Sequence, residues 1–549
     1  MTATAAPEGR ASSVLRSGAV MAAGSVVSRA TGFVRSAVVA AALGVGALAD
    51  GYAVGNSVPT IVYMLLLGGA LNAVFVPELV KAAKEHEDGG AAYTDRLLTV
   101  CGLALLALTA GAVLAAPAIV DLYTDYEGAR RTMTVAFARY CLPQIFFLGL
   151  FTLLGQVLNA RGRFGAMMWT PVLNNVVVIA VFALYLAVAD GAEVTARETA
   201  LLGWGTTAGI AVQALALVPV LRAARFRWRP RFDWRGSGLA TPLRSAGWLV
   251  LLVLTNQAAY WVTTRLATAA GVRAEALGVD GGAGFAAYNN AYLLWAVPHG
   301  IVTVSLVTAL MPRMSAAATD GDRAGVRRDV GYALRTSAAA IVPAACALFA
   351  LAVPVLALVF QYGRTDADDI RRMAATLMAF APGLIALSGQ YVLTRAFYAL
   401  RDTRTPFLLN LLIAGTNAAL SWAAYEVLPA RWAVTGMAAA YSVALWAGWA
   451  ATGWALSRRL RGAGPTGRRG ADSAPAALAR LLLAAVPAAG LGLAATVVAA
   501  PAGPAGAGAA GGLVIAGVFA LLARPLRLRE VQALLAAARR RAAGPRRPD

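Results

Sequence analysis

Two arginines stand in the first long apolar run of this chain, where only side chains compatible with hydrocarbon are expected. Arg29 and Arg35 lie within residues 17–44, whose other members are Ala, Val, Gly, Ser, Met, Thr, Phe and Leu. A charge near the centre of a membrane-spanning helix costs at least about 2.5 kcal/mol, so something must offset it. A guanidinium group can bind a carboxylate or a phosphate through paired N–H donors. The two arginines therefore predict a site for an anionic group inside a membrane protein.

Further polar residues extend this candidate site. Asp50 follows the first apolar run closely enough to reach its outer end, and we expect it to act as a gate or as the charge partner of Arg35. Arg265 lies near the outer end of a later apolar run. Three amides either make hydrogen bonds between helices or contact the ligand, and the sequence leaves both interpretations open: Asn56, Asn256 and Asn289.

Patterns for catalysis, metals or cofactors are missing from the sequence. The chain has two histidines, and its three cysteines, Cys101, Cys141 and Cys346, lie far apart inside apolar runs. This spacing matches neither a zinc site nor a disulfide framework. No GxxxxGK[ST] phosphate loop occurs either. We therefore expect no enzyme activity, no cofactor and no metal.

The composition predicts the elements that must position these residues. Hydrophobic residues make up 59% of the 549-residue chain and charged residues only 14%, which is typical of a membrane protein. Fourteen stretches are long enough to span a bilayer. They cover residues 13–42, 51–80, 97–120, 132–158, 166–189, 199–221, 245–269, 283–311, 330–360, 373–400, 406–428, 432–456, 476–500 and 504–523.

The net charge of +21 is placed unevenly across these spans. Most of the 48 lysines and arginines fall on one side, which the positive-inside rule makes cytoplasmic, together with both termini. Such loops set the topology and contact anionic membrane lipids. Because the basic stretches carry no nucleic-acid-reading motif, we expect no nucleic-acid partner.

An internal repeat organises the spans. Pro77 and Pro312 end similar helices at an offset of 235 residues, and Gln156 and Gln390 match at an offset of 234. Matching Arg161 to Arg401 gives an offset of 240, so a short insertion falls between these points. Since six spans are an even number, both copies start on the same side and are parallel. The expected fold is an all-α polytopic membrane protein with about 14 transmembrane helices, two parallel six-helix repeats plus two extra C-terminal helices.

The predicted domain boundaries follow from this repeat. Residues 13–221 form an N-terminal six-helix lobe, and residues 245–456 form its C-terminal counterpart. A basic cytoplasmic linker, residues 222–244, joins them. A second cytoplasmic linker at 457–475 leads to the last two helices at 476–523, and a basic cytoplasmic tail follows at 524–549.

Six motifs, in order, make the resemblance to a family specific. They are SRATGFVR at 28–35, LGVGALADGYAVGNSVP at 43–59, LLLGGALNAVFVP at 65–77, LNARGRF at 158–164, VPHGIVTVSLVTALMPRMS at 297–315 and RAFYALRDTRTP at 395–406. With them, residues 13–525 resemble the MurJ/MviN family, the lipid II flippase branch of the multidrug/oligosaccharidyl-lipid/polysaccharide exporter superfamily.

The resemblance implies a function. Two lobes would surround a central cavity, with the last two helices shaping a groove for a lipid tail. The substrate would be undecaprenyl-pyrophosphate-linked muropeptide, lipid II, moved from the inner to the outer leaflet of the bacterial plasma membrane by alternating access. Cell-wall synthases are possible partners, and the oligomeric state is open. Charge pairs near the duplicated short cytoplasmic loops would latch the lobes; the candidates are Arg161, Arg163, Arg395, Asp402 and Arg404.

This chain departs from the family at two positions. Many members carry arginines in the middle of the second helix and in the eighth, where Tyr63 and Leu293 stand here. The polar amides then share the binding of the headgroup, or the substrate differs. Two alternatives therefore stay open: a flippase for another polyprenyl-linked glycan, and a non-transporting scaffold of cell-wall synthesis.

Overall fold

A computed structural model describes residues 8–66, 90–161, 163, 165–189, 194–233, 247–279, 281–461 and 473–532, and every regular element in these ranges is a helix. The repeat motif at 71–85, linker residues 234–244 and 462–472, and the tail beyond residue 532 lie outside them. Within these ranges, eleven continuous helical stretches are long and apolar enough to cross a membrane. The predicted all-α polytopic class is confirmed.

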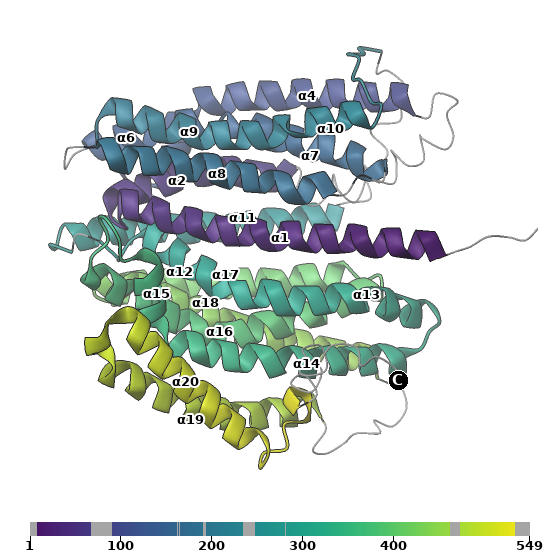
Figure 1. Cartoon of the computed structure of the whole chain (residues 1–549), viewed down its shortest axis with the longest axis vertical. Helices are drawn as coiled ribbons and strands as arrows, with labels where there is room; N and C mark the ends of the chain where they lie inside the picture. The colour runs from purple at the N-terminus through teal and green to yellow at the C-terminus, as the bar shows by residue number, and fades with distance from the viewer. Residues whose placement is uncertain are drawn as a thin grey trace, which may run out of the picture. The chain divides into compact units, whose positions relative to one another are not determined.

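The chain forms two compact units, the first comprising residues 1–257 with 362–364 and the second residues 258–361 with 365–549 (Figure 1). The first holds α1 (Glu8–Leu43), α2 (Ala47–Leu66), α4 (Ala91–Leu114), α5 (Ala116–Tyr123), α6 (Gly128–Cys141), α7 (Gln144–Ala160), α8 (Gly165–Val188), α9 (Ala196–Leu215), α10 (Leu217–Ala223) and the start of α11 (Gly247–Glu275). Residues 362–364 join it because the Arg364 N–H donates to the Ala41 carbonyl at 3.0 Å.

The second unit holds the rest of α11 and the later helices. These are α12 (Phe285–Pro298), a π-helix (His299–Thr303), α13 (Val304–Thr319), α14 (Arg323–Ala350), α15 (Ala352–Phe360), α16 (Ala367–Ala399), α17 (Arg404–Val427), α18 (Ala430–Arg459), α19 (Ala474–Val498) and α20 (Gly503–Ala523). The last two pair closely and α19 packs on α14 (Figure 1). Small residues allow this approach, since Gly492 of α19 meets Ile515 of α20 and Gly511 of α20 meets Thr496 of α19.

Four predicted spans are each built from two helices. The second helix of each begins within two residues of a proline, which lacks the N–H needed to continue the hydrogen-bond ladder. The prolines and the helices that begin beside them are Pro117 with α5, Pro143 with α7, Pro219 with α10 and Pro354 with α15. Counting apolar residues alone does not reveal these breaks.

The internal repeat has structural counterparts in the two units. Asp95 and Asp329 are buried near the starts of α4 and α14, and Gln156 and Gln390 are buried in α7 and α16. The sequence separation between the aspartate and the glutamine is the same in both copies. Each unit also has an apolar core at this end, built around Leu158 in the first and Phe397 in the second.

Candidate functional site

The helix α1 packs against α8 through small and polar residues (Figure 1). A Cβ atom on Gly24 would lie 2.8 Å from the indole nitrogen of Trp169, so glycine is needed for this approach. Farther along, Asn175 of α8 donates from Nδ2 to the Ser28 carbonyl at 3.0 Å and to the Thr31 hydroxyl at 2.9 Å. These contacts fix which face of α1 meets α8.

The same contacts leave Arg29 exposed. At about 100° per residue, Arg29 lies about 100° around the helix from Ser28 and shares a narrow polar stripe with the half-buried Ser25 and Ser36, whereas Gly32 faces Asn175 of α8. The rest of the exposed arc is apolar: Phe33 lies next to Arg29, followed by Val26, Ala30 and Val34, and such side chains are compatible with contact to lipid. Because an exposed guanidinium in a spanning helix needs water or an anion, the polar stripe is the side of α1 on which such a partner would bind.

Arg35 lies on a different side of the helix. It comes two turns after Ser28, is half-buried, and lies near enough to the Tyr52 hydroxyl for an electrostatic interaction. That hydroxyl also pairs with Thr206 of α9 at 3.0 Å. The two arginines of the candidate site are therefore in different environments, one exposed and the other partly enclosed by the first unit.

A largely buried ion pair joins α2 to α6 in the first unit. Asp50, in the first turn of α2, is 1% exposed, and its Oδ2 lies 3.7 Å from Nη2 of Arg130 in α6. The Arg130 guanidinium lies 4.2 Å from the ring centroid of Tyr126. The sequence interpretation missed Arg130, although adjacent arginines on the sparsely basic outer side were a usable signal.

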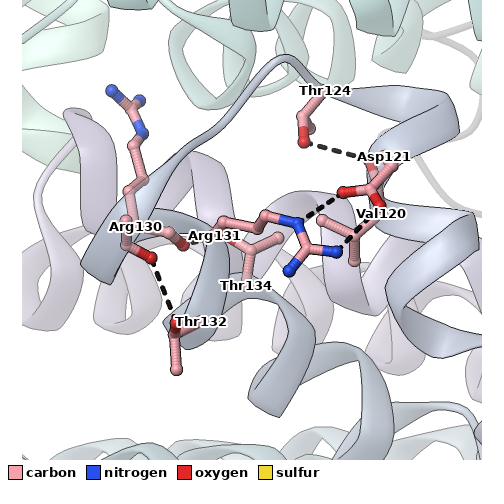
Figure 2. Close-up of polar contacts among 8 residues, drawn as sticks. Val120, Asp121, Thr124, Arg130, Arg131, Thr132 and Thr134 are labelled. Carbon is pink, nitrogen blue, oxygen red and sulfur yellow. Dashed lines mark hydrogen bonds and ion pairs between the residues drawn. The ribbon is translucent and has the colours of Figure 1, made fainter.

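The neighbouring Arg131 binds a different carboxylate. Its Nε and Nη2 donate to the two oxygens of Asp121 at 2.6 and 2.8 Å, which ties α5 to α6. Figure 2 shows the guanidinium groups of Arg130 and Arg131 pointing in different directions. The hydrogen bond from Arg131 holds the pKa of Asp121 below its ordinary value of 3.8.

The remaining candidates of the outer and central parts lie in varied environments. Asn56 accepts a hydrogen bond from Gln144 Nε2 at 3.1 Å, which joins α2 to α7. Tyr63, in place of the arginine that many family members carry, accepts one from the Thr152 hydroxyl at 3.0 Å. Asn256 is exposed, and Arg265 and Asn289 are half-buried.

Three of the five proposed latch residues contact residues of their own unit. Arg161 donates to the Ala224 carbonyl at 3.2 Å, and Arg395 donates to the Tyr391 hydroxyl at 3.0 Å. Asp402 accepts from the Thr405 N–H at 3.0 Å and from its hydroxyl at 2.8 Å, which caps the start of α17. Arg163 and Arg404 are exposed. Across the described ranges, no group of three or more His, Cys, Asp or Glu residues could hold a metal ion.

Comparison with known proteins shows which family this chain belongs to. The family model described as lipid II flippase MurJ matches residues 39–500. The chain belongs to the MurJ family. It is 27% identical over 437 residues to the probable lipid II flippase MurJ of Synechocystis sp., covering 76% of this chain and 78% of the relative. It is 28% identical over 391 residues to lipid II flippase MurJ of Burkholderia cenocepacia, covering 69% and 72%.

Solved structures agree with this assignment at the level of the fold. A lipid II flippase MurJ in an inward closed conformation superimposes with a TM-score of 0.71 at 16% identity, covering 92% of this chain and 99% of that one. An inward-facing multidrug resistance MATE family transporter of the MOP superfamily gives 0.62 at 16% identity, covering 79% and 96%. MurJ-family proteins are transporters, not enzymes.

Proposed function

We propose that this protein moves lipid II from the inner to the outer leaflet of the bacterial plasma membrane by alternating access. One observation carries the proposal: Arg29 is exposed on a polar stripe of a spanning helix, in a chain of the lipid II flippase family. The anionic partner that the sequence predicts for Arg29 is then the pyrophosphate of the lipid-linked precursor.

Arg29 is the proposed primary contact with this pyrophosphate. A guanidinium presents two parallel N–H donors that match two phosphate oxygens, and such charge-assisted bonds are stronger than neutral ones. Asn175 holds α1 against α8, so the direction of Arg29 is set before substrate binds. Little conformational entropy of α1 is then lost on binding.

Asp50 and Arg130 are the proposed outer gate of the first unit. Their pair is largely withdrawn from solvent, so separating it would leave two costly charges. Alternating access would disrupt such a pair when the outer side opens and restore it when that side closes. Arg35, near this end, is proposed to attract the pyrophosphate as it leaves Arg29.

The remaining assignments belong to the same proposal. Asn56, Asn256, Arg265 and Asn289 contribute secondary contacts to the headgroup. Arg161, Arg163, Arg395, Asp402 and Arg404 act at the cytoplasmic end during reorientation. Both termini are cytoplasmic, anionic lipids surround the basic loops, and the synthases that consume lipid II are the expected partners.

Complementation tests the proposal. A bacterial strain depleted of its own lipid II flippase should grow when this chain is expressed at native level. Failure to grow, with the protein inserted and abundant, would reject lipid II as the substrate. Rescue of a strain lacking a flippase for another polyprenyl-linked glycan would then support that activity. If neither strain is rescued, the remaining alternative is a non-transporting scaffold of cell-wall synthesis.

A further inference from the structure

The first part of the basic linker is a folded segment bound to α4. Residues 224–233, which we call the linker strap, begin with a turn at residues 224–225 and continue as irregular backbone from residue 226. The backbone N–H of Arg229 donates to Asp95 Oδ1 at 3.2 Å, and that of Arg231 donates to the Thr99 hydroxyl at 3.1 Å. The Trp228 indole N–H also donates to Thr99, at 3.3 Å. Backbone outside helices and sheets needs such partners for its polar groups, and α4 supplies them.

Both ends of the linker strap are fixed as well. At its start, Arg161 at the end of α7 donates to the Ala224 carbonyl, and its guanidinium lies 4.8 Å from the ring centroid of Phe226, which is buried. At its far end, Asp233 accepts from Arg96 Nη2 at 2.5 Å. The linker strap therefore holds a defined position at the ends of α4 and α7.

That position leaves basic and aromatic side chains exposed. The strap carries four arginines, Arg225, Arg227, Arg229 and Arg231, interspersed with its aromatic residues. All four arginines are exposed. Trp228 is 51% and Phe232 66% exposed. Asp95 and Thr99, which anchor the strap, lie in the first turns of the spanning helix α4, so the strap lies at the level where a bilayer presents its headgroups.

We infer that the linker strap binds the phosphate headgroups of anionic phospholipids in the leaflet beside it. Arginines attract an anionic membrane surface, and tryptophan and phenylalanine bury apolar area at the boundary between headgroups and acyl chains. The single acidic side chain of the strap, Asp233, is bound by Arg96, so it offsets little of the positive charge facing the lipid. The inference makes specific the proposed contact of the basic loops with anionic lipids; because it needs no transported substrate, its failure would leave the transport proposal unchanged.

Lipid selectivity measured beside the strap tests this inference. The full chain, with its three cysteines replaced by alanine and Phe232→Cys carrying a fluorophore, is reconstituted in phosphatidylcholine vesicles without lipid II. Quenching by headgroup-spin-labelled phosphatidylglycerol is compared with quenching by spin-labelled phosphatidylcholine. The preference for phosphatidylglycerol should be clear at low salt and should weaken as salt screens the charges.

Three variants distinguish lipid binding by the strap from attraction by the overall positive charge of the protein. Changing the four strap arginines to glutamine should lower the preference for phosphatidylglycerol by at least about tenfold. Changing Arg458, Arg459 and Arg461 to glutamine, at the end of α18, should leave the preference within about twofold, because these arginines are not part of the strap. Asp95→Asn should lower it while keeping every arginine, because it weakens the anchor of the strap.

Two outcomes would overturn the inference. One is an equal loss of the preference for phosphatidylglycerol in the strap variant and in the α18 variant, which would mean that general positive charge attracts the lipid. The other is no preference for phosphatidylglycerol in the parent protein. If the fourfold variant does not insert, Arg227→Gln with Arg231→Gln serves in its place, with an expected loss of at least about threefold.

Discussion

At the scale of the residue, the surroundings of Arg29 and Arg35 distinguish two groups that the sequence presents as a pair. Their types and their depth in an apolar run predicted an anion site. Which of them is accessible depends on the rotation of α1, and Asn175 sets that rotation through Ser28 and Thr31. The contact joins residues 144 positions or more apart, so no local pattern around the arginines reveals it.

Replacing Asn175 by alanine should weaken this helix contact. Hydrogen bonds between membrane helices contribute about 0.6 kcal/mol on average and up to about 1.7 kcal/mol, so the free energy of unfolding should fall within that range. The matched control is Asn174→Ala on the same helix, whose Oδ1 is buried with no hydrogen-bond partner in the structure. Unfolding in detergent measures both, and an equal loss in the two variants would contradict the role of Asn175.

At the scale of the element, most helix ends agree with the predicted spans within a few residues. Predicted span 504–523 is α20, Gly503–Ala523, and predicted span 406–428 is α17, Arg404–Val427. The structure differs from the prediction at prolines such as Pro143 and Pro354, where a span that hydropathy predicts as one helix is divided into two. Asp50, which the sequence suggested as a charge partner of Arg35, forms an ion pair with Arg130 of α6, a contact that sequence proximity does not reveal.

This pairing predicts the result of a double-mutant cycle. Asp50→Asn and Arg130→Gln should each reduce stability, and the double variant should lose less than the sum of the two. The expected coupling is about 0.5–3 kcal/mol, as for charges in contact. The cycle of Asp50→Asn with Arg35→Gln should show a smaller coupling. A larger coupling to Arg35 would instead make Arg35 the charge partner.

The link between α5 and α6 should depend on pH in one direction. The Asp121 carboxyl has a lowered pKa in the folded protein, so its pair with Arg131 is intact at neutral pH and is lost as the pH falls through that pKa, below 3.8. The difference in Tm between the parent and Asp121→Asn should be small, because the pair is exposed, and constant above about pH 5. A difference that disappears between pH 7 and pH 5 would rule out the lowered pKa.

At the scale of the whole molecule, hydropathy and duplication made the architecture predictable. The repeat followed from matching motifs, and Asp95 with Asp329 now adds a buried pair of counterparts. The linker was predicted only as basic and polar. Its fixed course over α4 depends on Asp95 and Thr99, more than a hundred residues earlier in the chain, and linker composition carries no signal for such contacts.

The positive-inside assignment predicts which residues can be labelled from each side of the membrane. In a chain free of native cysteines, Phe232→Cys should react with a membrane-impermeant maleimide only after the cells are opened. Glu127→Cys, exposed before α6, should react in intact cells. Labelling of Phe232→Cys in intact cells would reverse the topology and place the linker outside.

The central claim, that Arg29 holds the headgroup during transport, is tested most directly by lipid II accessibility at the outer leaflet. Cells depleted of their own flippase would express the parent chain, Arg29→Ala, Arg29→Lys or the control Arg139→Ala, which removes another exposed arginine of the first unit. The parent and Arg139→Ala should expose lipid II headgroups, Arg29→Lys should do so partly because it lacks the two-donor fork, and Arg29→Ala should fail although inserted normally. Normal headgroup exposure in the Arg29→Ala variant would contradict the account.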